Sequence, residues 1–471
     1  MLISKYSAPD FDPYGDKKPE EPDALWPAPT AGGPLRARLA LPGSKSITNR
    51  ELVLAALADA PSLLRAPLHS RDSANMVAAL RALGTRIEER EGAGSFGADL
   101  LVTPGELSGS TTIDCGQAGT VMRFVPPVAA LALGPTTFDA ADSARSRPMG
   151  GIVAALRALG VDIDDAGRGG LPFTVHGTGR VVGGAIEIDA SASSQFVSAL
   201  LLSAARFDEG LRLTHVGDRL PSLPHIEMTI DALAHRGVEV QNPRVGEWIV
   251  APGTIGARDV DIEPDLSNAA PFLAAALVTG GSVTITGWPD ATTQVGADLA
   301  DILPAFGATV QLDGSALTVS GGDGIRGVTL DLTTGGELAP TVAALSALAD
   351  SPSTITGIGH IRHHETDRLA ALATEIRSLG GEVDELDDGL RITPRPLHEG
   401  VWRSYEDHRM STSGALIGLA VPGIRIENVE ATHKTLPQFT SLWHNMLGQV
   451  NRGRHAITDA APATDARTAT S

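Results

Sequence analysis

The chain has 471 residues, of which 42% are hydrophobic and 20% charged, so its composition supports a large buried core and excludes a disordered protein. Its formal net charge of −19 excludes a general binder of nucleic acid or membrane surfaces, since such proteins carry a broad basic face. The single cysteine, Cys115, excludes an internal disulfide and a cysteine-based zinc site, so we expect a cytoplasmic protein. No apolar run reaches the ~20 residues of a membrane span.

The two ends of the chain differ from its body. Residues 1–33 are rich in proline, Asp and Glu and lack an apolar stretch, which predicts a flexible extension and no secretory signal. Residues 453–471 are polar, rich in Ala and Thr and without periodicity, so we expect a disordered tail. The folded body is therefore predicted between residues 34 and 452.

The body contains an internal repeat, in which an amphipathic helix ends at a glycine and leads into a strand. Glycine is favoured there because it tolerates the left-handed helix cap. Six copies follow one another at intervals of 68 to 77 residues, and their glycines are Gly84, Gly160, Gly237, Gly307, Gly380 and Gly448. This regular spacing predicts six copies of one structural unit.

Between these helices lies a second helix type, which opens on small or polar residues and continues in Ala, Leu and Val. It occurs at 44–59, 115–133, 191–205, 265–281, 335–350 and 405–421. These segments are apolar almost all round, so we expect buried helices. Alternating segments at 36–41, 281–286, 327–332 and 423–429 predict strands. The pattern indicates an α/β fold with two helices and several strands in each repeat.

The strand at 36–41 has no helix before it, whereas the sixth repeat lacks a clear closing strand. We therefore expect this strand to complete the last repeat, with two crossings between lobes near 42–44 and 263–265. The first lobe would then span 44–263 and hold repeats 1–3. The second would combine 34–43 with 264–452 and hold repeats 4–6.

Several helix openings carry cations, although the helix macrodipole disfavours Lys and Arg there. The residues concerned are Lys45, Arg50, Arg123, Arg145, Arg147, Arg368, Arg409 and Lys434. A cation near one helix start is more often simply solvated, but recurrence in successive repeats favours a shared anion site. The G-S-K-S segment at 43–46 lacks the spacing of a phosphate loop, so we exclude an ATPase.

Seven motifs in chain order carry a family likeness. They are L-P-G-S-K-S-I-T-N-R (41–50), A-G-T-V-M-R (118–123), R-P-M-G (147–150), S-S-Q-F-V-S-A-L-L (193–201), H-E-T-D-R-L (364–369), E-D-H-R-M (406–410) and H-K-T-L-P (433–437). Together they resemble the 5-enolpyruvylshikimate-3-phosphate (EPSP) synthase family of enolpyruvyl transferases over roughly residues 34 to 450. The resemblance implies two similar lobes that close on substrate, each of three βαβαββ units, in an inside-out α/β barrel.

The resemblance also implies the reaction and its setting. The enolpyruvyl group of phosphoenolpyruvate would pass to the 5-hydroxyl of shikimate 3-phosphate, releasing phosphate, in chorismate and aromatic amino acid biosynthesis. No metal or organic cofactor is implied, the protein would be a monomer, and neither nucleic acid nor membrane is a partner. The two substrates are polyanions, which accounts for a cationic cleft.

Carried over position by position, the resemblance assigns site residues. Shikimate 3-phosphate would contact Lys45, Ser46, Arg50, Ser193, Ser194, Gln195, Ser222, Glu337 and His364. Phosphoenolpyruvate would contact Lys45, Gly119, Arg147, Gln195, Arg368, Arg409 and Lys434. The catalytic set would be Glu337, Glu365, Lys45 and Lys434, with Glu337 taking the hydroxyl proton and Glu365 exchanging a proton with the methylene carbon.

The chain departs from the family at four of these positions or their neighbours. His364 stands where Lys is common, Glu337 where Asp is common, His360 where Asn is usual and His225 where Tyr is frequent. The charge of a histidine at 364 depends on pH. Asp331 is an alternative base to Glu337, although it lies inside a predicted strand.

Three further questions stay open at this point. Arg123 would either contact substrate or support residues that do. Cys115 suggests the related enzyme that transfers enolpyruvate to UDP-N-acetylglucosamine with a loop cysteine, although we favour a small buried thiol there. A non-catalytic scaffold is disfavoured because Lys45, Glu365 and Arg409 are intact. Gly119 and the R-P-M-G loop predict sensitivity to glyphosate, the inhibitor of the resembling family.

Overall fold

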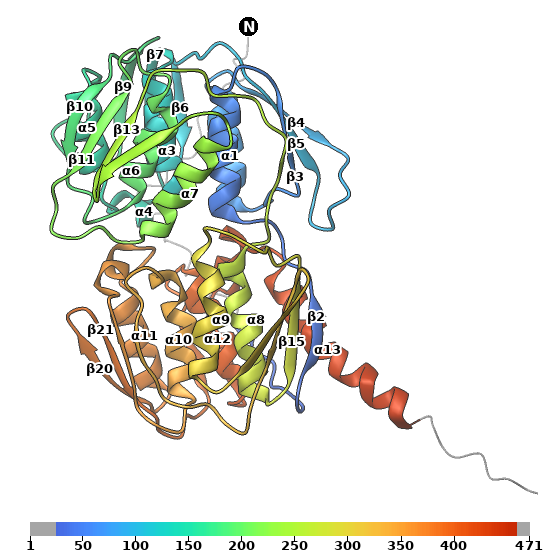
Figure 1. Ribbon diagram of the computed structural model, residues 1–471. Helices are drawn as coiled ribbons and strands as arrows, with labels where there is room; N and C mark the ends of the chain where they lie inside the picture. Colours follow the sequence, from blue (N-terminus) through green and yellow to red (C-terminus); the bar gives the residue numbers. More distant parts are fainter. Residues whose placement is uncertain (1–24, 459–471) are drawn as a thin grey trace, which may run out of the picture.

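The computed structural model describes residues 25–458, which form two stacked lobes with a mixed α/β composition (Figure 1). This confirms the predicted fold class. Each lobe has its own hydrophobic core, one drawn from residues between 52 and 255, the other from residues between 28 and 41 and between 266 and 446. The residue boundaries expected for the two lobes stay predictions.

The first lobe contains the elements from α1 to β14. Their bounds are α1 (Lys45–Leu57), β3 (Ser62–Arg65), α2 (Arg71–Ala82), β4 (Arg86–Arg90), β5 (Asp99–Thr103), β6 (Thr111–Asp114), α3 (Gly119–Ala130), β7 (Leu133–Asp139), α4 (Asp142–Arg145), α5 (Gly150–Ala158), β8 (Asp162–Asp164), β9 (Phe173–Thr178), β10 (Gly184–Ile188), α6 (Gln195–Ala204), β11 (Leu211–His215), α7 (Leu223–Ala234), β12 (Val240–Arg244), β13 (Glu247–Val250) and β14 (Val260–Asp261).

The second lobe contains the two N-terminal strands and everything after the return crossing. Its elements are β1 (Trp26–Pro27), β2 (Arg36–Leu39), α8 (Leu266–Thr279), β15 (Ser282–Thr286), η1 (Val295–Asp298), α9 (Leu299–Ala305), β16 (Thr309–Asp313), β17 (Ala316–Ser320), β18 (Thr329–Asp331), η2 (Gly336–Leu338), α10 (Ala339–Ala347), β19 (Ser353–Thr356), η3 (Gly359–His363), α11 (Arg368–Ser378), β20 (Glu382–Leu386), β21 (Gly389–Thr393), β22 (Gly400–Trp402), α12 (His408–Gly418), β23 (Ile424–Ile426), η4 (Val429–Lys434) and α13 (Phe439–Thr458).

The sheets repeat one pairing scheme. Sheets β6-β7-β9-β8, β10-β11-β13-β12 and β18-β19-β21-β20 each place the fourth strand between the second and the third. The first two strands pair in parallel and the remaining contacts are antiparallel, as in β6 with β7 and β7 with β9. A parallel pair requires a crossover, which the buried helix supplies. Each of these repeats is therefore a βαβαββ unit.

Two strands are exchanged at the lobe crossings. Strand β14 pairs in parallel with β3 and completes the first repeat, and β2 pairs in parallel with β15 and completes the fourth. The expectation that the strand at 36–41 completes the last repeat is therefore wrong, although this strand does lie in the second lobe. Strand β1 joins the last repeat instead, antiparallel to β23. Each of these strands is thus the first strand of a four-stranded unit, which would otherwise have only three strands.

The two crossings lie side by side. Gly43 forms an isolated antiparallel bridge with Pro264, the Ser44 amide donates to the Glu263 carbonyl at 2.7 Å, and the Asp265 amide donates to the Pro42 carbonyl at 2.9 Å. A Cβ at position 43 would collide with a neighbouring backbone carbonyl, so glycine is required there. The chain thus passes from one lobe to the other through one narrow double connection.

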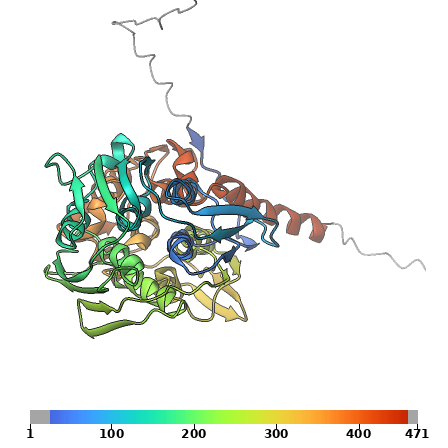
Figure 2. The same ribbon diagram turned by 90° about the horizontal axis from the view of Figure 1, so that it is seen from above.

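Three helices form the centre of each lobe. Helices α1, α3 and α6 pack on one another in the first lobe, as do α8, α10 and α12 in the second, and nearly all their residues are buried. Because they are buried on all sides, they are stable only when other elements cover them. Sheets and further helices pack against these central helices, whereas α13 projects away from the body, as Figure 1 and Figure 2 show.

The ends of the body differ from expectation in two places. Residues 25–33 are not simply a flexible extension, because they include β1 and the Ala28 amide donates to the Ile424 carbonyl at 3.0 Å. Helix α13 runs through Gly448 to Thr458, so that glycine does not end it and the predicted tail from 453 begins too early. The other five repeat glycines have positive φ, as predicted for helix ends. Residues 1–24 and 459–471 lie outside the described residues.

Candidate functional site

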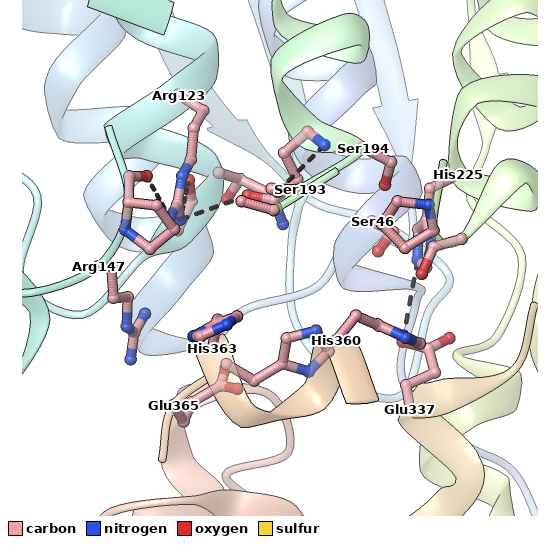
Figure 3. Close-up of a pocket in the computed structure, with 18 of the residues that line it drawn as sticks. Ser46, Arg123, Arg147, Ser193, Ser194, His225, Glu337, His360, His363 and Glu365 are labelled. Atoms are coloured by element: carbon pink, nitrogen blue, oxygen red, sulfur yellow. Dashed lines mark hydrogen bonds and ion pairs between the residues drawn. The ribbon is translucent and has the colours of Figure 1, made fainter. Parts of the chain in front are cut away.

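A cavity lies between the two lobes, where several helices begin (Figure 3). From the first lobe, Lys45 at the start of α1, Gly119 at the start of α3 and Gln195 at the start of α6 line it. From the second, Glu337 on η2 and Arg409 in the first turn of α12 face them. The free amides and positive dipole ends of helix N-termini make such a place suitable for anions.

Cations outnumber anions around this cavity, although the whole chain carries a net charge of −19. The lining cations are Lys45, Arg50, Arg123, Arg147, Arg368 and Arg409, whereas the lining carboxylates are Asp72, Glu337 and Glu365. The excess positive charge is thus local, and it attracts small polyanions rather than an extended one.

Arg50 is a buried cation whose hydrogen bonds all go to neutral oxygens. Its guanidinium donates to the Thr229 hydroxyl at 2.8 Å and to the backbone carbonyls of Ser46 and His225 at 2.9 and 2.8 Å. It lies 5.3 Å from the centre of the Phe124 ring. Burial lowers the pKa of Arg50 to about 9, against the opposing effect of the Glu337 charge. A bound anion would offset this desolvation.

Arg123 and Arg147 form a second group of cations without a carboxylate contact. Arg123 donates to the carbonyls of Gly119 and Pro148 at 3.3 and 3.1 Å, and Arg147 donates to the carbonyl of Gln117 at 2.8 Å. The Nε atoms of both arginines are buried without a hydrogen-bond partner. Burial, and next the charge of Arg147, lower the pKa of Arg123 to about 10. Both arginines also belong to the cavity lining.

Gly119 lies against these arginines. A Cβ added there would lie 2.7 Å from Nη1 of Arg123 and 3.4 Å from Oε1 of Gln195. The same Gln195 oxygen accepts from Arg123 at 3.5 Å. A side chain at position 119 would therefore displace the groups that face the cavity.

Glu365, Lys434 and Arg368 form a buried network in the second lobe. Glu365 lies 2.7 Å from Nζ of Lys434 and 2.8 Å from Nη2 of Arg368, which in turn pairs with Asp407 through its Nε at 2.7 Å. Burial raises the pKa of Glu365, but Lys434 and Arg368 outweigh it and hold that pKa well below its usual range. The carboxylate is therefore ionised and held between two cations.

Glu337 has a different set of partners. It accepts from the Ser267 hydroxyl at 2.6 Å and from Arg409 at 3.2 Å, and Nε2 of His225 lies 3.8 Å away across the lobes. Burial raises the pKa of Glu337, but the charges of Arg409 and then His225 act in the opposite direction, and the pKa falls to about 2. Asp331, the alternative base, is exposed on β18, bonds to the neighbouring Thr333 and does not line the cavity.

Serine hydroxyls line the first-lobe side. Ser193 and Ser194 precede α6, and Ser194 makes no side-chain capping bond to that helix, which leaves its hydroxyl available to a ligand. Ser222 precedes α7 with a left-handed φ of 54° and also lines the cavity, as does Ser46 in α1. These neutral donors line the same cavity as Arg50, a combination suited to phosphate oxygens.

Five histidines line the cavity: His225, His360, His363, His364 and His408. His364 contacts Nη1 of Arg368 through its Nδ1 at 2.9 Å. Burial, and then the Arg368 charge, hold the pKa of His364 well below 6.5, and burial lowers the pKa of His360 to about 4. His364 is thus neutral at pH 7 and differs in charge from the Lys common in the resembling family.

The cavity gathers the residues expected from the motifs, with Lys434 joined through Glu365; their individual roles stay predictions. The lining residues to which sequence reasoning gave no role are Asp72, Thr120, Pro148, Ala192, Pro221, His363 and His408. Asp72, 3.7 Å from Nζ of Lys45, looks like an ordinary acid in the first turn of a helix. His408, by contrast, stands inside the quoted motif E-D-H-R-M, and that position was the available signal.

Cys115 lies outside the cavity lining. Its side chain is buried, and burial, with Asp114 next, raises the pKa of the thiol to about 12. Cys115, the residue that suggested the enzyme acting on UDP-N-acetylglucosamine, is therefore not part of the site. Within the described residues, no three His, Cys, Asp or Glu side chains lie close enough together to hold a metal ion. No helix in that part of the chain has the length and apolar character needed to span a bilayer.

The sequence matches a family model and, among curated proteins, a named relative. The model of the family described as EPSP synthase (3-phosphoshikimate 1-carboxyvinyltransferase) matches residues 29–443. A curated protein from Kocuria rhizophila, named 3-phosphoshikimate 1-carboxyvinyltransferase, is 55% identical over 432 residues, which cover 90% of this chain and 97% of that protein.

Solved structures give the fold. An EPSP synthase from Acinetobacter baumannii superposes with a TM-score of 0.72 at 21% identity, covering 91% of this chain and 97% of that one. The enolpyruvyl transferase NikO from Streptomyces tendae superposes with a TM-score of 0.70 at 18% identity, covering 91% and 98%. At these identities the two structures establish a shared two-lobed architecture alone.

Proposed function

We propose, from the premise that this chain belongs to the EPSP synthase family, that it transfers the enolpyruvyl group of phosphoenolpyruvate to the 5-hydroxyl of shikimate 3-phosphate and releases phosphate. This reaction belongs to chorismate and aromatic amino acid biosynthesis. The observation that carries the proposal is a set of arginines without carboxylate contacts around one interlobe cavity: the buried Arg50 and Arg123 and the half-buried Arg147. Two small phosphorylated substrates would supply the missing negative charge.

The two substrates take different ends of the cavity in this proposal. The shikimate phosphate binds beside Arg50 and the hydroxyls of Ser193, Ser194 and Ser222. Phosphoenolpyruvate binds where Arg147 of the first lobe faces Arg368 and Arg409 of the second, with Gln195 between the two substrates. Lys45 reaches both. Holding two polyanions in attack geometry is itself a large contribution to the rate.

The chemistry requires three proton transfers, one at the hydroxyl and two at the methylene carbon. The 5-hydroxyl adds to C2 of phosphoenolpyruvate and loses its proton, while the methylene carbon C3 gains one, which gives a tetrahedral intermediate. That intermediate then loses a proton from C3 and expels phosphate, so the double bond is restored. Glu337 takes the hydroxyl proton, which the departing phosphate then carries away. Glu365, ionised in the free protein, binds a proton from solvent once substrate charge offsets Lys434 and Arg368, delivers that proton to C3 and recovers it when C3 is deprotonated.

Substrate charge tunes both carboxylates. Arg409 lowers the pKa of Glu337, and Lys434 and Arg368 lower that of Glu365. When phosphoenolpyruvate occupies these cations, its own negative charge offsets their effect, and both carboxylates become stronger bases. Lys45 and Lys434 stabilise the charge that develops on the substrate oxygens.

The finer setting belongs to the same proposal. The protein works as a monomer in the cytoplasm, with phosphoenolpyruvate and shikimate 3-phosphate as its only small-molecule partners and without a metal or organic cofactor. The absence of a membrane-spanning helix in residues 25–458 agrees with such a setting.

Phosphate release tests the function directly. The purified protein is incubated with phosphoenolpyruvate and either shikimate 3-phosphate or UDP-N-acetylglucosamine, and inorganic phosphate is measured. We expect release only with shikimate 3-phosphate, with loss in Lys45→Met and retention in Glu239→Gln, a change of an exposed carboxylate. Release only with the nucleotide sugar overturns the acceptor, and release with neither favours a scaffold.

A further inference from the structure

Gln117 and Glu406 join the two lobes at the edge of the cavity. Nε2 of Gln117, in the turn before α3, donates to Oε2 of Glu406, in the turn before α12, at 2.5 Å. Neither residue lines the cavity. The same Gln117 amide donates to the Ser143 hydroxyl at 3.1 Å, so the side chain is held on its own lobe as well.

Gln117 and Glu406 are each linked to arginines that line the cavity. The backbone carbonyl of Gln117 accepts from Nη1 of Arg147 at 2.8 Å. On the other side, Glu406 directly precedes Asp407, whose carboxylate pairs with Arg368 and also accepts from the backbone amide of Arg409 at 2.8 Å. The hydrogen bond between Gln117 and Glu406 therefore links the segment that contacts Arg147 in the first lobe to the segment that contacts Arg368 and Arg409 in the second.

The turn that carries Glu406 is strained and braced. Tyr405 and Glu406 have φ of 53° and 55°, a left-handed conformation that residues other than glycine adopt at a cost. Glu375 of α11, fully buried, accepts from the Tyr405 hydroxyl at 2.6 Å and from the Arg403 amide at 3.0 Å. Such strain persists only where surrounding contacts hold it, and here the held conformation presents Glu406 to the other lobe.

We propose that Gln117 and Glu406 are positioning residues, an interlobe latch that holds Arg147 opposite Arg368 and Arg409 and thereby forms the phosphoenolpyruvate end of the cavity. The assignment of that end rests on the proposed function. The latch acts through the arginines and touches no substrate. Its loss therefore weakens phosphoenolpyruvate binding more than binding of shikimate 3-phosphate, whose expected contacts lie almost wholly on the first lobe.

A second interlobe contact provides the matched control. Arg219 of the first lobe lies 3.4 Å from Asp388 of the second, with both side chains about half exposed. Asp388 supports η3 by accepting from the Gly359 amide, at a separate place in the interface. Arg219→Ala removes one interlobe contact and leaves Gln117 and Glu406 in place.

Steady-state kinetics test the latch with Gln117→Ala, Glu406→Ala and the conservative Glu406→Gln, which retains a carbonyl acceptor for Gln117. We expect both alanine variants to raise KM for phosphoenolpyruvate about fivefold, with KM for shikimate 3-phosphate within about twofold of wild type. Glu406→Gln should restore wild-type values, and Arg219→Ala should leave the ratio of the two KM values unchanged. Equal effects on both substrates, or an equal change in Arg219→Ala, overturn the proposal.

A distance measurement separates this proposal from the proposed function, because it needs no turnover. Spin labels on cysteines introduced at the exposed positions Glu187 and Asp384 report the separation of the lobes, and the buried Cys115 does not interfere. Glu406→Ala should broaden the distance distribution toward longer values, and Glu406→Gln should not. Unchanged distances in Glu406→Ala overturn the latch even if the wild type turns over both substrates. An inactive wild type with the expected distances overturns the function and leaves the interlobe contact established.

Discussion

The carboxylate of Glu365 lies 2.7 Å from the ammonium of Lys434, and only 14% and 2% of these side chains are exposed. The two residues are 69 positions apart in sequence, and the segment between them includes the helices α11 and α12. Burial lowers the pKa of Lys434, while Glu365 raises it, so each partner supports the charged form of the other. A buried pair of this kind is costly to break. In the proposed reaction, phosphoenolpyruvate binds beside this pair and contacts Lys434.

Replacing Glu365 tests its role in proton exchange. Glu365→Gln keeps the size of the side chain and a hydrogen-bond acceptor for Lys434 but cannot exchange a proton with C3. We expect kcat to fall about 10²- to 10⁴-fold while the far-UV circular dichroism stays that of the wild type. Glu239→Gln, at an exposed site, is the control for a changed carboxylate. A variant with the full wild-type rate would show that Glu365 is not the proton carrier.

Arg50 gives a prediction about anion binding. Its guanidinium is buried without a carboxylate partner, and Arg50→Met removes the charge while filling much of the space. Shikimate 3-phosphate at 100 times its Kd should stabilise the wild type by about 2.7 kcal/mol and raise its Tm. The variant should lose this shift, whereas Arg212→Met, a partly exposed arginine outside the cavity, should keep it. Thermal unfolding with and without ligand decides, and an unaltered shift in Arg50→Met contradicts the assignment.

His360 predicts how stability depends on pH. Its pKa is about 6.5 in an unfolded chain and about 4 here, because burial, and then the charge of Arg219, disfavour the protonated ring. Below pH 6.5 the unfolded state therefore binds a proton that the folded state does not. The free energy of unfolding falls as pH drops from 6.5 toward 4, by about 2 kcal/mol at pH 5.

His360→Asn removes this contribution. Between pH 7 and pH 5, the free energy of unfolding of the variant should fall by about 2 kcal/mol less than that of the wild type. Urea unfolding of both proteins at both pH values measures this difference. The other cavity histidines are present in both proteins, so they cancel in the difference. Parallel pH profiles for the two proteins would mean that His360 titrates normally in the folded state.

Gly119 predicts the response to glyphosate, which should inhibit competitively with phosphoenolpyruvate. The Cβ of Gly119→Ala would lie 2.7 Å from Nη1 of Arg123, so the arginine must shift. We expect a Ki for glyphosate raised about tenfold or more, together with a higher KM for phosphoenolpyruvate. Gly253→Ala is the matched control, because its Cβ would meet nothing within 4 Å and the residue does not line the cavity. Undiminished wild-type activity at high inhibitor concentration contradicts the sensitivity itself.

Much of the architecture could be predicted because it depends on local patterns. Five of the six repeat glycines occupy left-handed helix ends, and the apolar helices are buried as expected. Gly448 is the exception, since it lies within α13. A glycine permits a helix to end but does not force it to end.

Strand pairing was the least predictable part of the fold. The alternating segment at 36–41 was correctly expected to be a strand, but its partner, β15, lies more than 240 residues further on. The pattern of β2, in which Ala37 and Leu39 are buried and Arg36 and Arg38 are exposed, specifies a half-buried strand and fits several sheet edges equally well. In the structure, β2 pairs with β15 of the fourth repeat, directly before the crossing at Gly43.

The sequence by itself determined the family, the repeated α/β unit and the residue types of the site, because motifs and helix periodicity are properties of neighbouring residues. Only the tertiary structure decided which cations are paired. Arg368 lies against Asp407 and Glu365, whereas Arg50 and Arg123 meet neutral oxygens alone. It also decided that His360 and His364 are neutral at pH 7. Burial and opposing charges set these properties, and both come from segments far apart in the chain that meet only when the lobes are assembled.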